Sequence, residues 1–102
     1  MKTVPAILAL TLLASTGDVY AQSPARGLAI ASEVCTECHA IRKGQPRSPN
    51  ARSPTFPQIA AVPGMTEAAL TVALTTPHAG MPMFILTPEQ RSDVIAYILS
   101  LK

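Results

Sequence analysis

Two cysteines and a histidine lie together in the string Cys35-Thr36-Glu37-Cys38-His39, and they constrain the possible folds more than any other part of the sequence. They are the only cysteines in the chain. Cysteines three positions apart at the end of a helix can reach the two vinyl groups on one edge of a haem. Each thiol can form a thioether bond there, and the adjacent imidazole then meets the iron. The string therefore predicts one covalently attached haem c per chain.

Three other interpretations of the cysteine pair are less well supported. A disulfide between Cys35 and Cys38 would close a very small ring and would stabilise the chain little. A thioredoxin-like redox pair normally lies beside a strand–helix–strand pattern, and no segment of the sequence alternates like a strand. A zinc site is arithmetically possible, because His78 would bring the candidate ligands to four. However, Cys38 and His39 are adjacent, and the spacing to His78 matches no finger or ribbon motif.

The first 21 residues have the three-part layout of a secretory signal peptide. Lys2 supplies a positive charge, an apolar run extends from Val4 to Ala14, and a polar stretch, residues 15–18, leads to Val19-Tyr20-Ala21. The apolar run is too short to cross a membrane, which takes about 20 residues. We expect cleavage after Ala21, no stable membrane insertion, and a periplasmic domain formed by residues 22–102.

The composition of this domain also suggests that a cofactor fills its centre. Tryptophan is absent, and the aromatic residues after the expected cleavage site are Phe56, Phe84 and Tyr97. Domains this small bury little surface and usually need a disulfide, a metal or a cofactor for stability. The formal net charge is only +2, with no basic stripe dense enough to bind nucleic acid.

Three helices are predicted from caps and apolar periodicity. The first covers residues 23–37 with Ser23 as its cap, the second follows Thr66, and the third begins at Thr87-Pro88-Glu89-Gln90 and continues to Leu101. Between them we expect two irregular loops, residues 40–64 with five prolines and residues 76–86. Loops this long are rare in a compact domain unless they surround something. The expected fold is all-α, with helices and loops wrapped around the haem.

The second loop is expected to supply a second ligand to the iron. The candidates are Met65, Met81, Met83 and His78. A thioether stabilises reduced iron and suits electron transfer, whereas an open position suits the binding of gases. Met81 is favoured because it lies between two proline-marked turns, with Met83 and His78 as the alternatives. His78 itself is expected to be an exposed loop residue.

In this arrangement the chain resembles the class I cytochromes c of bacteria over essentially all of residues 22–102. In that family a glycine precedes the first cysteine by eight residues, as Gly27 precedes Cys35, and the axial methionine is followed by proline, as in Met81-Pro82. An aromatic residue of the last helix, here Tyr97, packs on the first helix.

The resemblance also implies a role for Pro54, whose carbonyl would accept a hydrogen bond from the His39 imidazole. The chain departs from the family pattern in having extra prolines before Pro54. A second departure is Ala31, which stands where many relatives have a larger aromatic residue. Thinner packing between the first and last helices is therefore expected.

A haem held by His39 and Met81 would have no open position for a substrate. We therefore expect a monomeric one-electron carrier, not an enzyme, that meets redox proteins such as a dehydrogenase, oxidase or reductase transiently. A haem sensor or catalytic haem protein with a labile sixth ligand is the alternative class. A dedicated subunit of a larger redox complex would use the same chemistry.

Four basic residues lie close together in the first loop, with no acidic residue among them: Arg42, Lys43, Arg47 and Arg52. They could neutralise the haem propionates, steer an acidic partner, or simply be solvated. Solvation is the most common explanation for such a run of charges.

Overall fold

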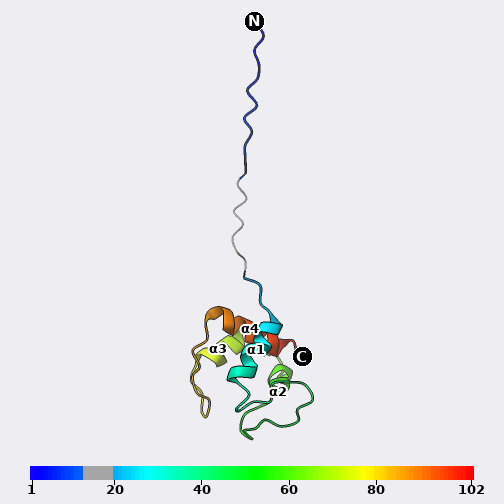
Figure 1. The fold of residues 1–102 in the computed structure, drawn as a ribbon, viewed down its shortest axis with the longest axis vertical. Helices are drawn as coiled ribbons and strands as arrows, with labels where there is room; N and C mark the ends of the chain where they lie inside the picture. The colour runs from blue at the N-terminus through cyan, green and yellow to red at the C-terminus, as the bar shows by residue number, and fades with distance from the viewer. Residues whose placement is uncertain (13–19) are drawn as a thin grey trace.

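The fold is described from a computed structural model that covers residues 1–12 and 20–102. Over this part of the chain the helices are α1 (Pro24–Val34), α2 (Phe56–Ala61), α3 (Glu67–Thr75) and α4 (Pro88–Leu99) (Figure 1). The β-type pairing among the described residues is one isolated bridge between His78 and Met81. The prediction of an all-α fold is confirmed.

Each helix begins at a hydroxyl side chain that accepts a hydrogen bond from the first turn of its own backbone. The four caps are Ser23, Thr55, Thr66 and Thr87. In α2 and α4 the side-chain oxygen of a glutamine three residues later also accepts a hydrogen bond from the backbone N–H of the cap, which completes a capping box. These local contacts explain why the starts of the three predicted helices agree with the structure.

The prediction of a continuous loop over residues 40–64 is wrong at α2. Pro57 lies in the first turn of this helix. A backbone N–H at this position would have no partner within the helix, so proline costs no hydrogen bond there. The Thr55–Gln58 capping box then satisfies the free backbone donors. The first predicted helix is also shorter than expected, because α1 ends at Val34 and Cys35 is its C-cap.

The helices α1 and α4 cross at Gly27, so closely that no side chain fits between them. A Cβ atom added to Gly27 would lie 1.9 Å from the backbone oxygen of Asp93 and 2.8 Å from Cβ of Tyr97. One turn further along α1, Ala31 is 0% exposed. The small residues at both positions let the two backbones approach, and the expectation of thinner packing around Ala31 is not met.

Replacing Gly27 with alanine should therefore destabilise the holoprotein strongly. The new methyl group must push α4 away, and overpacking of this kind costs about 3 kcal/mol. The free energy of unfolding in guanidinium measures the effect. Ser32→Ala on the exposed face of the same helix is the control and should change stability by less than about 0.5 kcal/mol. Equal stability of the Gly27 variant and the parent protein would contradict the close crossing.

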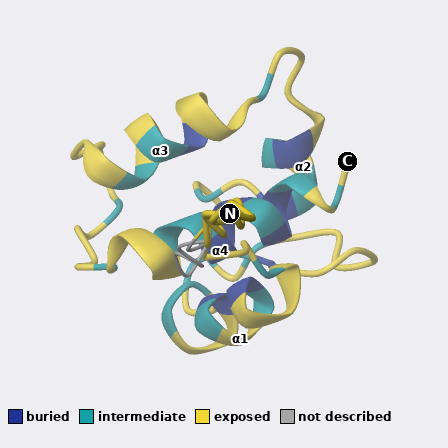
Figure 2. Cartoon of the chain, turned by 90° about the horizontal axis from the view of Figure 1, so that it is seen from above, coloured by how far each residue is buried: buried dark blue, intermediate teal, exposed yellow. Residues whose placement is uncertain are grey.

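The rest of the core forms around α4, which lies between α1 and α2 (Figure 2). The buried cluster consists of Ala31, Ile41, Phe56, Ala60, Leu70, Val94, Ile95, Tyr97 and Ile98. The hydroxyl of Tyr97 donates a hydrogen bond of 2.5 Å to the backbone oxygen of Ile41. This bond attaches the loop that follows His39 to the last helix.

The expected signal peptide is only partly described. Residues 1–12 contain no helix and are exposed, and Figure 1 shows them as an extended segment. The polar stretch 15–18 and Val19 lie outside the described residues. In the described ranges, no helix is long and apolar enough to cross a membrane.

Candidate cofactor site

A cavity of about 300 Å³ lies between the end of α1, helices α2, α3 and α4, and the loop that joins α3 to α4. Apolar residues form nearly all of its wall. The exceptions among its lining side chains are the thiol of Cys35 and the imidazoles of His39 and His78. A cavity of this kind suits a large apolar ligand that is held by a few chemically specific groups.

The end of α1 brings the cysteine–histidine string to this cavity. Beyond the last residue of α1, the backbone turns tightly, with the N–H of Cys38 and the N–H of His39 donating to the Cys35 oxygen over 3.2 and 2.9 Å. Cys35 and His39 line the cavity, whereas Cys38 lies on the same turn and is not part of the wall. Neither cysteine is in a disulfide.

Burial raises the pKa of the Cys35 thiol to about 11. A thiol with a raised pKa is a weak nucleophile at neutral pH, because disulfide exchange needs the thiolate. In the described part of the chain no group of three or more histidine, cysteine or acidic side chains is placed to hold a metal ion. Among the described residues, the zinc interpretation therefore lacks a set of ligands.

The His39 ring is oriented by the segment that leads into α2. Its Nδ1 atom lies 2.7 Å from the backbone oxygen of Pro54. Because a carbonyl oxygen can only accept, Nδ1 carries the proton and Nε2 keeps a free electron pair for a metal. The Phe56 ring lies 5.5 Å from the imidazole, measured between centroids. The N–H of Phe56 donates to the oxygen of Ala40 over 2.9 Å, which fixes this segment beside the histidine.

The loop between α3 and α4 places three candidate ligands on the wall of the same cavity: His78, Met81 and Met83. Gly80 has φ +77°, a left-handed conformation, and the N–H of Met81 donates to the oxygen of His78 over 3.3 Å. Met81 is half-buried, whereas His78 is exposed and the Met83 side chain is 53% exposed. Met65, which directly precedes the N-cap of α3, also lines the cavity.

A second cavity of about 250 Å³ adjoins the first. The two share part of their lining, namely His39, Pro54, His78 and Met81. The remaining wall of the second cavity is more polar and includes Asn50, Arg52 and Ser53. A flat molecule that is mostly apolar but carries charged groups at its edge fits this combination of surroundings.

The family model for Cytochrome c matches residues 24–102. The chain belongs to the cytochrome c family. It is also similar to the cytochrome c-552 of Bradyrhizobium diazoefficiens, with 32% identity over 95 residues that cover 93% of this chain and 90% of the relative. No solved structure gives a significant match.

Membership of this family makes the chain a haem c electron carrier, and the residues around the cavity fit that cofactor. The apolar wall can take the porphyrin, the Cys35 thiol stands at its edge, and the oriented imidazole of His39 is available to the iron. Imidazole nitrogen and methionine sulfur are the ligands that haem iron takes in cytochromes c.

Some residues near the site escaped the sequence analysis. The contact between Phe56 and His39 was not predicted, although an aromatic residue two positions after Pro54 is a possible signal. Asp93 is 2% exposed and packs at the crossing of α1 and α4. In the sequence, Asp93 is a charged residue directly before the apolar stripe of the last helix. A residue in that position usually lies at the edge of the solvated face.

Proposed function

We propose that residues 22–102 are an exported monohaem cytochrome c that carries one electron at a time, with His39 and Met81 as the axial ligands of the iron. Cys35 and Cys38 would hold the haem through thioether bonds, and the Pro54 carbonyl would orient the His39 ring. The observation that carries this proposal is that Cys35, His39 and Met81 line one and the same apolar cavity.

Electron transfer is the activity that such a site favours. The haem supplies the chemistry, because its iron can gain and release one electron. The chain binds the cofactor, keeps water away with apolar side chains, and sets the potential through its ligands. When both axial positions are filled by protein, no position is left for a substrate. We therefore propose a carrier and not an enzyme.

The choice of Met81 over its neighbours is supported by its position in the fold. It is half-buried, and its backbone is held by the hydrogen bond to His78 and followed by Pro82. Met83 is more exposed. Ordered backbone on both sides of a ligand reduces the entropy that is lost when the sulfur binds the iron.

Transient redox partners fit a small monomeric carrier. The four basic residues of the first loop, Arg42, Lys43, Arg47 and Arg52, are all exposed. Arg52 also lines the polar cavity that adjoins the cofactor site. Exposed cations near the cofactor would attract an acidic surface and speed the encounter at low ionic strength. Small, weak interfaces are typical of such redox complexes.

A visible spectrum in both oxidation states tests this proposal. The protein should be matured in a host that has haem-attachment machinery and an export pathway. We expect the sharp reduced-state bands of a low-spin c-type haem, together with the weak far-red band of methionine-ligated ferric iron. A high-spin spectrum would instead favour ligand sensing or catalysis, and absence of haem would contradict the proposal as a whole.

A further inference from the structure

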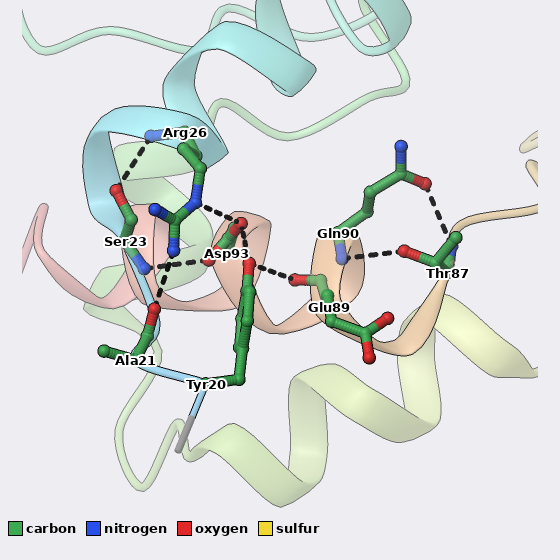
Figure 3. A network of polar contacts seen from close by, with 8 residues as sticks. All are labelled: Tyr20, Ala21, Ser23, Arg26, Thr87, Glu89, Gln90 and Asp93. Carbon is green, nitrogen blue, oxygen red and sulfur yellow. Dashed lines mark hydrogen bonds and ion pairs between the residues drawn. The ribbon is translucent and has the colours of Figure 1, made fainter. Parts of the chain in front are cut away.

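The carboxylate of Asp93 lies at the crossing of α1 and α4 and is 2% exposed. The N–H of Ser23 donates to its Oδ1 over 2.8 Å, and Nε of Arg26 donates to its Oδ2 over 3.1 Å. The Tyr20 hydroxyl donates to the same Oδ2 (Figure 3). Burial by itself raises the pKa of Asp93, but the hydrogen bonds from Tyr20, Ser23 and Arg26 hold it below its ordinary value.

Part of this network precedes the proposed cleavage site. The backbone oxygen of Ala21 accepts a hydrogen bond of 2.7 Å from Nη2 of Arg26, and the Arg26 guanidinium lies 5.2 Å from the centre of the Tyr20 ring. Cleavage between Ala21 and Gln22 removes the Tyr20 hydroxyl from Asp93 and the Ala21 oxygen from Arg26. The buried carboxylate then has one donor fewer, and an unfilled acceptor at a buried site is costly.

The same cleavage creates a new donor beside the carboxylate. Hydrolysis adds water across the Ala21–Gln22 bond, so that Ala21 leaves with a carboxylate and Gln22 gains an α-amino group that binds a proton. Only the Cα and the carbonyl carbon of Gln22 separate this nitrogen from the nitrogen of Ser23, which already donates to Asp93. Standard bond lengths therefore keep it within about 7 Å of Oδ1.

Gln22 is held in place independently of the residues that cleavage removes. Its side-chain Nε2 donates to Oε1 of Glu67, at the start of α3, over 2.8 Å. Once Gln22 is the first residue, rotation about its Cα–C bond can turn the amino group towards Asp93 without moving α1. The same rotation also moves the Gln22 side chain, so its exposed contact with Glu67 has to re-form through the side-chain torsions. A charge-assisted hydrogen bond of this type is roughly twice as strong as one between neutral groups.

We propose that Asp93 is the anchor for the N-terminus that signal-peptide removal creates. The α-ammonium of Gln22 takes the place of the Tyr20 hydroxyl on the Asp93 carboxylate and ties α1 to α4. This inference rests on the proposed cleavage after Ala21. A positive charge at the start of a helix is unfavourable on its own, because it opposes the helix dipole. Asp93 reverses that effect, so the exact starting residue of the processed chain determines its stability.

A pair of holoproteins with different N-termini tests the anchor. One begins at Gln22, and the other carries two extra alanines before Gln22, which move the charged amine away without restoring Tyr20. The second alanine also returns the Ala21 oxygen to Arg26, and the Asp93→Asn pair corrects for this contact. Both are made with Asp93 and with Asp93→Asn, and a mass spectrum verifies each N-terminus. Glu89→Gln is the matched control, since it removes an exposed acidic charge from the first turn of the same helix.

We expect the form that begins at Gln22 to have an unfolding equilibrium constant about tenfold lower than the extended form, as for one hydrogen bond to a charged group. The difference should persist with Glu89→Gln and should vanish or change sign with Asp93→Asn, where only the unfavourable helix dipole remains. Equal stability of the two Asp93 forms, or the same difference in the Asp93→Asn pair, would overturn the inference.

A second readout covers the case in which Asp93→Asn does not fold. In the Asp93 proteins, the α-amino group at Gln22 should react with an acylating reagent at neutral pH several-fold more slowly than that of the extended form. Equal reactivity would also overturn the anchor. Failure of the anchor can be distinguished from failure of the proposed function. The visible spectrum would reveal that haem is missing, and the mass spectrum of the processed chain would reveal a different cleavage site.

Discussion

Replacing Met81 with alanine should abolish the bond between sulfur and iron. The weak far-red band of the ferric protein should disappear, and the reduction potential should fall by about 0.1 V or more, within the ~0.8 V over which axial ligands tune haem iron. Loss of the thioether removes the ligand that favours reduced iron. The visible spectrum and a redox titration of the purified holoprotein measure both effects.

Two neighbouring residues of the same loop serve as controls for this experiment. Met83→Ala and His78→Ala should each keep the far-red band, although both side chains line the same cavity. Retention of the band in Met81→Ala, with its loss in Met83→Ala, would transfer the ligand role to Met83. A band that is insensitive to both methionine substitutions would contradict ligation from this loop.

The parts of the fold that the sequence could predict are those determined by neighbouring residues. Caps such as Ser23, Thr66 and Thr87 act on backbone groups three positions away, and their helices begin where they were expected. The same reasoning missed α2, because a helix of six residues is too short to show apolar periodicity. The proline at its second position is also typical of a loop.

Long-range contacts explain most of what remained hidden. The hydrogen bond from Tyr97 to the Ile41 oxygen joins residues 56 positions apart, and no local pattern indicates it. The resemblance to the cytochromes c predicts that the Pro54 carbonyl lies beside His39. In the structure the Pro54 oxygen is 2.7 Å from Nδ1 of His39. Composition and spacing alone would not have selected Pro54 from the five prolines of residues 40–64.

Asp93 shows a different limit of sequence analysis. A charged residue at the edge of an apolar stripe normally lies in solvent, yet here it is buried by the close crossing at Gly27. Its partners Ser23 and Arg26 come from the other helix. The role of such a residue depends on how two helices approach each other, and helical periodicity carries no information about that distance.

Replacing both Cys35 and Cys38 with serine should release the haem from the polypeptide. Serine cannot form a thioether with a vinyl group, so acidified organic solvent should extract the cofactor, and a denaturing gel stained for haem should show no signal at the size of the protein. The domain should also lose most of its stability, because an empty apolar cavity would replace the cofactor at its centre.

The two single variants separate covalent attachment from packing. Cys35→Ser or Cys38→Ser should each keep one thioether, so the haem should stay on the denatured chain while the reduced-state bands shift towards those of a haem with one free vinyl group. Of the two sulfurs, only that of Cys35 lines the cavity, and its loss should therefore destabilise the folded holoprotein more. Haem that remains bound to the denatured double variant would show that neither cysteine attaches it.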